Sequence, residues 1–207
     1  SRVDQTDRDI SLLSNEDRES WRSRNLRRAI RLSDKNSIAL NLLVRARKKL
    51  EQVRLKHENA AGLVIAKDIL HAKAIATFLK ENGDTVQLVH SQNKESVKTL
   101  SSFERSQAKW LVSIDMCSEG FDAPRLRLVA YLTTIVTKSR FIQAITRAVR
   151  MSSLRESVEP VPRNPSFVYA PADPLLMKYA RIWSVAKPYL IGINSSDASS
   201  EQGLYVS

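Results

Sequence analysis

From residue 61 onward, short apolar runs alternate with segments of helical periodicity, and this alternation restricts the fold more than any other feature of the sequence. The apolar runs have the length of buried strands, and the helical segments between them are about three turns long. Strands are expected at 63–66, 86–89, 110–114, 128–132 and 166–170, and helices at 69–81, 94–105, 140–150 and 175–186. Such an alternation predicts a three-layer α/β domain with a parallel sheet. Ligands of these sheets bind at the carboxyl ends of the strands.

The segment before this domain is strongly basic. Residues 18–56 hold thirteen Lys and Arg against three acidic residues, which accounts for nearly all of the net charge of +11. Apolar residues recur at helical spacing over 20–32 and over 38–56, so two basic amphipathic helices are expected there. Concentrated positive charge favours a polyanionic partner, nucleic acid first, although a solvated helical face would have the same composition. The arginines of the first helix that would contact phosphates are Arg24, Arg27, Arg28 and Arg31.

The second basic helix carries an apolar stripe that should pack on the domain behind it. We therefore expect a basic helical extension over 1–60, the α/β domain over 61–190 and a mobile tail over 191–207. No stretch approaches the ~18 to 20 apolar residues needed to span a membrane. The single cysteine, Cys117, cannot form an internal disulfide, which fits a cytoplasmic protein. The chain begins with Ser1, as an excised piece of a longer protein would.

The expected helix over 140–150 separates apolar and polar side chains. At ~100° per residue, Gln143, Arg147 and Arg150 fall within a sector of roughly 60°. Apolar residues, among them Phe141 and Ile145, occupy the opposite side. Two neighbouring guanidinium groups favour an anion such as phosphate, which arginine binds through forked contacts. Two surface arginines on an ordinary amphipathic helix would show the same pattern.

The loop that follows the expected strand over 110–114 contains Glu119, Gly120 and Asp122. It lies at the carboxyl end of a strand, where a ligand is expected. A glycine there permits close approach of a ligand to the backbone. The carboxylate of Asp122 could accept a hydrogen bond from a ribose hydroxyl, although a loop or capping aspartate is the ordinary alternative.

Two segments together resemble a known family. The sequence SIDMCSEGFDAP at 113–124 and the sequence QAITRAVR at 143–150 look like motifs V and VI of superfamily 2 helicases, in the same order. The strand at 63–66 resembles the strand of motif IV, and LVHS at 88–91 resembles the stretch that follows it. The resemblance covers 61–190 and is closest to the motor subunits of restriction enzymes and related DEAD/DEAH-type helicases. It implies a RecA-like domain of the P-loop NTPase type.

The resemblance also implies roles for individual residues. Arg147 and Arg150 would be arginine fingers that reach the γ-phosphate of ATP. The nucleotide would also be contacted or sensed by Gln143, Asp122, Gly120 and Glu119. The phosphate backbone of the bound strand would face Lys67, His71, Ser91, Met116, Cys117 and Ser118.

Two nucleotide-binding features are absent from the sequence. No G-x-x-x-x-G-K-[ST] loop occurs, and no Asp-Glu pair ends a strand to hold Mg²⁺. In the family both belong to a first RecA-like motor domain, so ATP and Mg²⁺ would be bound mainly by a preceding domain. We expect a second motor domain of a helicase or translocase that acts on DNA, with RNA as the alternative, and that is inactive as an ATPase without the first domain. No protein metal site and no membrane partner is expected. A nucleotide-independent nucleic-acid-binding module and an α/β protein-interaction domain are the alternatives.

Overall fold

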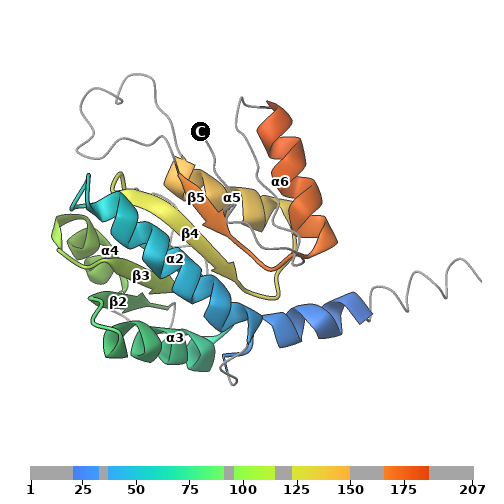
Figure 1. Ribbon diagram of the computed structural model, residues 1–207, viewed down its shortest axis with the longest axis horizontal. Helices are drawn as coiled ribbons and strands as arrows, with labels where there is room; N and C mark the ends of the chain where they lie inside the picture. Colours follow the sequence, from blue (N-terminus) through green and yellow to red (C-terminus); the bar gives the residue numbers. More distant parts are fainter. Residues whose placement is uncertain (1–20, 33–36, 91–95, 115–122, 150–165, 187–207) are drawn as a thin grey trace, which may run out of the picture.

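The described strands form one parallel sheet at the centre of the molecule (Figure 1). The computed structural model describes residues 21–32, 37–90, 96–114, 123–149 and 166–186. Within these residues the sheet has five strands in the order β2-β3-β1-β4-β5. The strands are β1 (Ala61–Ala66), β2 (Val86–Val89), β3 (Trp110–Ser113), β4 (Leu126–Leu132) and β5 (Phe167–Tyr169). Every neighbouring pair is parallel, and Leu63 of the central strand lies between Leu111 and Val129.

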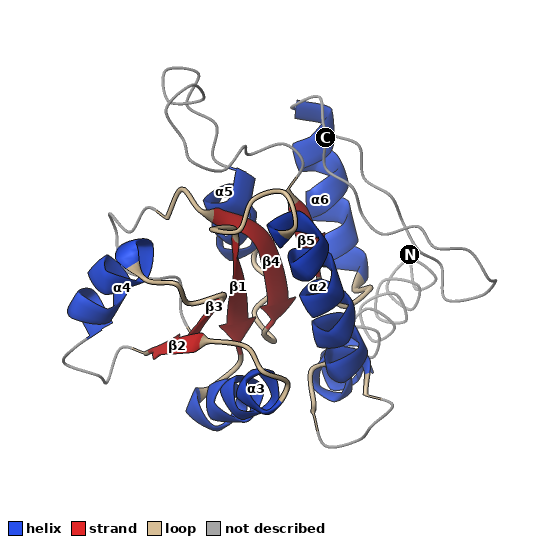
Figure 2. Ribbon diagram, turned by 60° about the vertical axis from the view of Figure 1, so that its left-hand side comes forward, coloured by secondary structure: helices blue, strands red, loops and turns tan. Residues whose placement is uncertain are grey.

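Helices cover both faces of the sheet (Figure 2). The helices are α2 (Ile38–Arg54), α3 (Ile69–Glu81), α4 (Ser96–Arg105), α5 (Lys138–Val149) and α6 (Pro174–Ala186). Residues 21–29 form a further helix before α2. One face of the sheet packs against α2 and α3, and the other packs against α4, α5 and α6. The three-layer α/β fold expected from the sequence is therefore confirmed.

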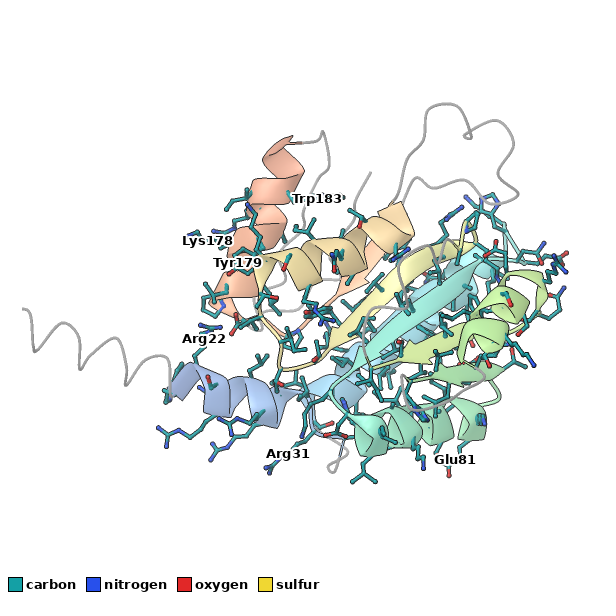
Figure 3. The ribbon with its side chains drawn as sticks, turned by 180° about the vertical axis from the view of Figure 1, so that it is seen from behind. Arg22, Arg31, Glu81, Lys178, Tyr179 and Trp183 are labelled. Atoms are coloured by element: carbon teal, nitrogen blue, oxygen red, sulfur yellow. The ribbon has the colours of Figure 1, made fainter. Side chains whose placement is uncertain are left out.

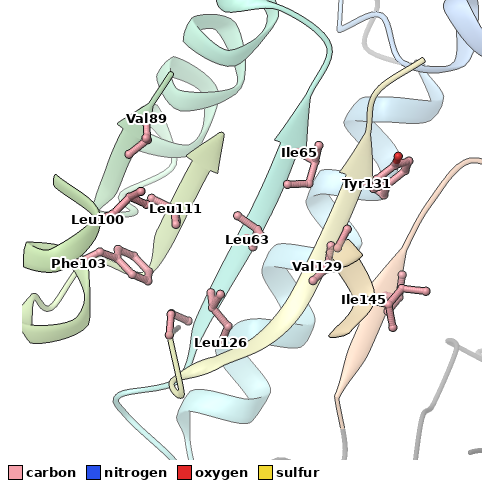
Figure 4. Packing of buried hydrophobic residues seen from close by; sticks show 14 of the residues in the cluster. Leu63, Ile65, Val89, Leu100, Phe103, Leu111, Leu126, Val129, Tyr131 and Ile145 are labelled. Atoms are coloured by element: carbon pink, nitrogen blue, oxygen red, sulfur yellow. The ribbon is translucent and has the colours of Figure 1, made fainter. Parts of the chain in front are cut away.

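The central strand shows why the sequence folds in this way. All six residues of β1 are buried. Successive side chains of a strand point to opposite faces, so Leu63 and Ile65 enter one core while Val64 and Ala66 enter the other. Figure 4 shows the first of these cores, in which Leu63 and Ile65 lie among side chains from β3, β4, α4 and α5. A strand that is buried on both faces must be apolar at every position, as the sequence is here.

The helix expected over 38–56 packs on the sheet as its apolar stripe predicts. It ends at Arg54, and its buried side chains are Ala39, Leu43, Ala46 and Leu50. These residues share a core with β1, β3 and β4. One of the two helices on this face of the sheet therefore comes from the segment assigned to the extension. The boundaries of 1–60, 61–190 and 191–207 stay predictions.

Local signals fix where the helices begin and end. Ser37 caps α2, because its hydroxyl accepts a hydrogen bond from the backbone N–H of Leu40 at 3.1 Å. The predicted stop of α3 at Asn82 and Gly83 is confirmed, since Gly83 has a φ of 82° that favours glycine. The other expected strands and helices agree with the structure to within two residues at each end where both ends are described. The largest changes are the earlier starts of β1, β4 and α5. The helix expected over 20–32 ends at residue 29.

Gly62 is required by packing rather than by backbone conformation. A Cβ atom at this position would lie 2.4 Å from Cζ3 of Trp110. The indole of Trp110 is fully buried, so it has no room to move aside. Trp110 is therefore a core residue, as its place on a buried strand suggests.

Candidate functional site

Helix α5 has the two faces that the sequence predicts. Phe141, Ala144 and Ile145 are buried against the sheet and α6. On the other side Gln143 is exposed and Arg147 is partly exposed. The apolar face fixes the rotation of the helix, so the amide and the guanidinium group are directed away from the core. Arg150 lies outside the described residues, as do Asp122, Gly120 and Glu119.

A buried tyrosine positions the start of α5. Tyr131, at the end of β4, donates a hydrogen bond from its hydroxyl to the backbone carbonyl of Ile135 at 2.6 Å. Its ring meets Phe141 of α5 edge-on, with the ring centroids 5.1 Å apart and the planes at 80°. Burial raises the pKa of Tyr131 to about 12, which keeps the hydroxyl protonated as a donor. The turn between β4 and α5 is thus held from the core.

Two further residues belong to the polar side of α5. The hydroxyl of Thr146 donates to the backbone carbonyl of Gln143 at 2.9 Å within the helix. This bond does not involve the Gln143 side chain. Arg140 is exposed and lies seven residues before Arg147, so both fall on one side of the helix. Arg140 is not among the residues predicted for this face, although the same helical spacing includes it.

A second group of candidate residues lies at the carboxyl end of β1. Lys67 is exposed, and its Nζ lies 3.1 Å from Oδ2 of Asp68. Asp68 caps α3, because its Oδ1 accepts from the backbone N–H of His71 at 2.8 Å. That bond is the main reason why the pKa of Asp68 is lowered. Lys67 and Asp68 thus form a charged turn at the edge where ligands of parallel sheets bind.

His71 is less available than its sequence position suggests. Its Nδ1 accepts a hydrogen bond from the backbone N–H of Lys67 at 3.1 Å, so a neutral ring carries its proton on Nε2. Burial lowers the pKa of His71, while Asp68 opposes this effect. The backbone of Ile30 also favours the charged ring, but Nε2 makes no hydrogen bond of ordinary geometry within the described residues. Lys67 is therefore the more exposed cation of the pair.

The candidate residues do not form one cluster. Lys67 lies just before α3 and His71 in its first turn, and α3 packs on one face of the sheet. Gln143 and Arg147 lie on α5, which packs on the opposite face. The other residues predicted to contact the nucleic acid, Ser91, Met116, Cys117 and Ser118, lie outside the described residues. The described part of the chain contains no group of three or more His, Cys, Asp and Glu side chains able to hold a metal ion. None of its helices is long and apolar enough to cross a membrane.

The basic helix over 21–29 is pinned by its apolar side. Leu26, Ala29 and Ile30 are buried. The arginines predicted to contact phosphate are exposed, namely Arg24, Arg27, Arg28 and Arg31. The structure thus agrees with the predicted amphipathic helix and places its arginines on the outer side.

Comparison with protein families gives a match to the helicase conserved C-terminal domain over residues 45–152, just over half of the chain. This range begins within α2 and extends beyond the end of α5. It includes both groups of candidate residues at β1 and on α5, whereas the 21–29 helix lies before it.

Three similar proteins match this chain over less than a third of their own length. An uncharacterised protein of Mycobacterium leprae is 30% identical over 71% of this chain, which is 24% of that protein. UvrABC system protein B of Rhodopirellula baltica is 32% identical over 51% of this chain and 16% of its own length. Among solved structures, the Hef helicase domain of Pyrococcus furiosus has a TM-score of 0.46 at 19% identity, covering 70% of this chain and 28% of that one. The chain thus spans about a quarter of the length of its mycobacterial relative.

Proposed function

Because this chain belongs to the family of helicase conserved C-terminal domains of superfamily 2, we propose that it is the second motor domain of an ATP-dependent helicase or translocase. The observation that carries the proposal is the family match across 45–152, with a two-faced α5 inside the matched range. The activity belongs to a longer protein, in which a first RecA-like domain precedes this one.

On the nucleotide side, the proposed work of this chain is electrostatic. Arg147 and Arg150 reach across the cleft between the two motor domains and stabilise the charge that develops on the γ-phosphate. Gln143 lines the same cleft, and Asp122 accepts a hydrogen bond from the ribose. Glu119 and Gly120 link this site to the nucleic-acid track. The buried contacts of Phe141 and Ala144 support this role, since they hold the polar side of α5 outward.

When bound, ATP would supply the phosphoryl group and Mg²⁺ would neutralise its charge during transfer. The described residues fit a supporting role only, because they contain no cluster of acidic or imidazole side chains for a metal. We therefore assign Mg²⁺ and most nucleotide contacts to the preceding domain. The chain's own part is to bring positively charged groups to a nucleotide bound there.

On the nucleic-acid side, the proposed track runs along the carboxyl ends of β1, β2 and β3. Lys67 is its exposed cation among the described residues, and His71 lies beside it. The other proposed contacts are Ser91, Met116, Cys117 and Ser118. Phosphate contacts carry no base information, so the motor moves along a strand with little regard to sequence. We propose DNA as the substrate ahead of RNA.

The domain assignment is tested by ATP turnover. The isolated 207-residue chain should hydrolyse no ATP, with or without DNA, since the phosphate loop and the Mg²⁺ ligands are lacking. A longer protein that includes the preceding domain should turn over ATP and be stimulated by DNA. Turnover by the isolated chain that disappears in Arg147→Ala and Arg150→Ala would overturn the assignment, because the whole catalytic site would then lie here.

A further inference from the structure

We propose that the helix over 21–29, with the turn that carries Arg31 directly after it, is an accessory clamp for the phosphate backbone of the nucleic acid, using Arg24, Arg27, Arg28 and Arg31 on its outward side. The inference rests on the proposed nucleic-acid motor and deepens it. The helix precedes the family match, which starts at residue 45, so it adds a contact surface outside the matched family domain.

The helix separates its residues by environment as well as by sequence. Leu26, Ala29 and Ile30 are 5%, 7% and 2% exposed. Arg24, Arg27 and Arg28 recur at steps of three and one residues, which places them within about 100° around the helix axis. The centre of this sector is roughly opposite the buried side chains. Arg31 follows in the turn that ends the helix, where its backbone N–H bonds to the carbonyl of Arg28 at 3.1 Å. The arginine side is therefore the surface that the packed helix presents.

The helix is also anchored through its remaining arginine. Nε of Arg22 lies 2.8 Å from Oδ2 of Asp173, and the Asp173 side chain is only 3% exposed. The other oxygen of Asp173 accepts from the backbone N–H of Leu175 at 2.9 Å at the start of α6. Figure 3 shows Arg22 on the side toward α6 and Arg31 pointing the other way, out of the molecule. An anchored helix presents its four outward arginines in a fixed arrangement, which reduces the entropic cost of binding.

The outward arginines carry charge that the described part of the chain does not neutralise. None of the four makes an ion pair with a described residue, and Arg27 makes its hydrogen bond to the carbonyl of Ser23 at 3.2 Å. From residue 24 to residue 31 the helix and the turn that ends it together rise ~10 Å. Each DNA strand carries a phosphate every ~3.4 Å, so such a row faces about three phosphates. Arginine binds phosphate through two parallel N–H donors, which makes a nucleic-acid backbone the matching occupant.

The arginine row also leads toward the proposed track. The backbone of Ile30, at the end of the helix, lies against the ring of His71. His71 and Lys67 follow β1 at its carboxyl end, where the track is proposed. A nucleic-acid strand that crosses this edge of the sheet would therefore contact the arginine row as it leaves the motor domain.

The test is the salt dependence of binding. The 207-residue chain is titrated with a short labelled oligonucleotide of random sequence, single-stranded or duplex, between about 50 and about 200 mM salt. The variant replaces Arg24, Arg27, Arg28 and Arg31 by Gln. The control replaces exposed cations elsewhere and has the same net charge: Lys48, Lys56, Lys80 and Arg105 to Gln. Thermal melts confirm that both are folded, and the pair Arg24→Gln with Arg28→Gln serves as a milder variant.

We expect the arginine variant to flatten the slope of log affinity against log salt by about 0.9 for each duplex phosphate it no longer neutralises, or about 0.7 for each single-strand phosphate, up to about 3 in all. The control should change the slope by less than the value for one phosphate, and the pair should show about half of the full effect. Equal slopes for the variant and the parent, or equal changes in the variant and the control, would overturn the clamp while leaving the motor assignment in place. A chain that binds neither oligonucleotide would overturn the clamp and the proposed track together.

Discussion

Arginines serve opposite purposes at two places in this molecule. At the amino ends of the strands, Arg125 is 4% exposed and is surrounded by backbone carbonyls. Its guanidinium donates to the carbonyls of Asn59 and Phe103 at 3.1 Å each, and also to those of Ser106 and Ala108. On the 21–29 helix and the turn after it, by contrast, the four outward arginines are exposed to solvent. Arginine side chains are thus hydrogen-bonded inside the fold in one region and exposed to solvent in the other.

The buried arginine ties together segments that precede different strands. Asn59 comes before β1, Phe103 and Ala108 lie in the segment that leads into β3, and Arg125 itself directly precedes β4. One side chain therefore links the segments that enter three strands. Its guanidinium also lies over the ring of Phe103 at 4.7 Å. Burial lowers the pKa of Arg125, and the negative charge of Glu104 opposes this effect. Charges at this edge are therefore structural.

A buried carboxylate at the same edge is satisfied in a similar way. Asp84, whose side chain is 1% exposed, lies 2.6 Å from Nε of Arg47 and 3.1 Å from Nζ of Lys109. Arg47 belongs to α2, and Lys109 directly precedes β3. The basic residues of this chain therefore have two separate roles. Part of the charge closes the amino edge of the sheet, and part remains outward for a polyanion.

The largest effect is expected where the charge is buried. Arg125→Met should lower the free energy of unfolding by about 3 to 5 kcal/mol, because several buried carbonyls would lose their hydrogen-bond donor. The measurement is denaturant unfolding of the 207-residue chain. Arg105→Met, an exposed arginine at the end of α4, is the control and should stay within about 0.5 kcal/mol of the parent.

Each of Arg24→Gln, Arg27→Gln, Arg28→Gln and Arg31→Gln should also remain near the parent in stability, since these side chains are exposed. Equal losses for Arg125→Met and for these outward arginines would break the contrast between the two regions.

The smallest effect is expected at the carboxyl edge, where His71 is partly buried. Its folded-state pKa lies below the ordinary value of 6.5, mainly because of burial. The unfolded chain therefore takes up its proton first as the pH falls, and stability decreases between about pH 7.5 and about pH 5.5. Asp68 has its pKa lowered from 3.8, so its own contribution is lost only in more acidic solution.

The matching variant is His71→Asn, which can still accept from Lys67 N–H but does not titrate. Melting temperatures across this pH range should fall less for the variant than for the parent. A parallel fall in both proteins would show that His71 does not become harder to protonate on folding.

Much of the fold could be predicted because it follows from local pattern. The strands β1, β3 and β4 are short apolar runs, and the two faces of α5 follow from helical spacing around Gln143. Arg140 would have been found by the same spacing. The environment of Arg125 could not be predicted, since its acceptors Asn59 and Phe103 lie 66 and 22 residues away in sequence. Which arginine is buried depends on contacts that form only when the strands assemble.

The candidate site shows the same division. The sequence places Lys67 and His71 at the carboxyl end of a strand, and the structure agrees. It does not reveal that Nδ1 of His71 is occupied by the backbone of Lys67, because that bond depends on the geometry of the turn. The roles of Arg147, Arg150 and Asp122 stay predictions. They concern a nucleotide that the preceding domain would hold.

The central claim is tested most directly by steady-state ATP hydrolysis of the longer protein at saturating DNA. Arg147→Ala and Arg150→Ala should each reduce kcat by about 10³-fold or more with little change in KM, because the contact forms mainly in the transition state. Lysine at either position should rescue poorly, since it lacks the planar fork. Arg105→Ala is the control and should keep parental turnover, and thermal melts verify that each variant is folded. If both alanine variants remain folded and keep near-parental kcat, α5 does not act on the nucleotide and the second-motor-domain account is contradicted.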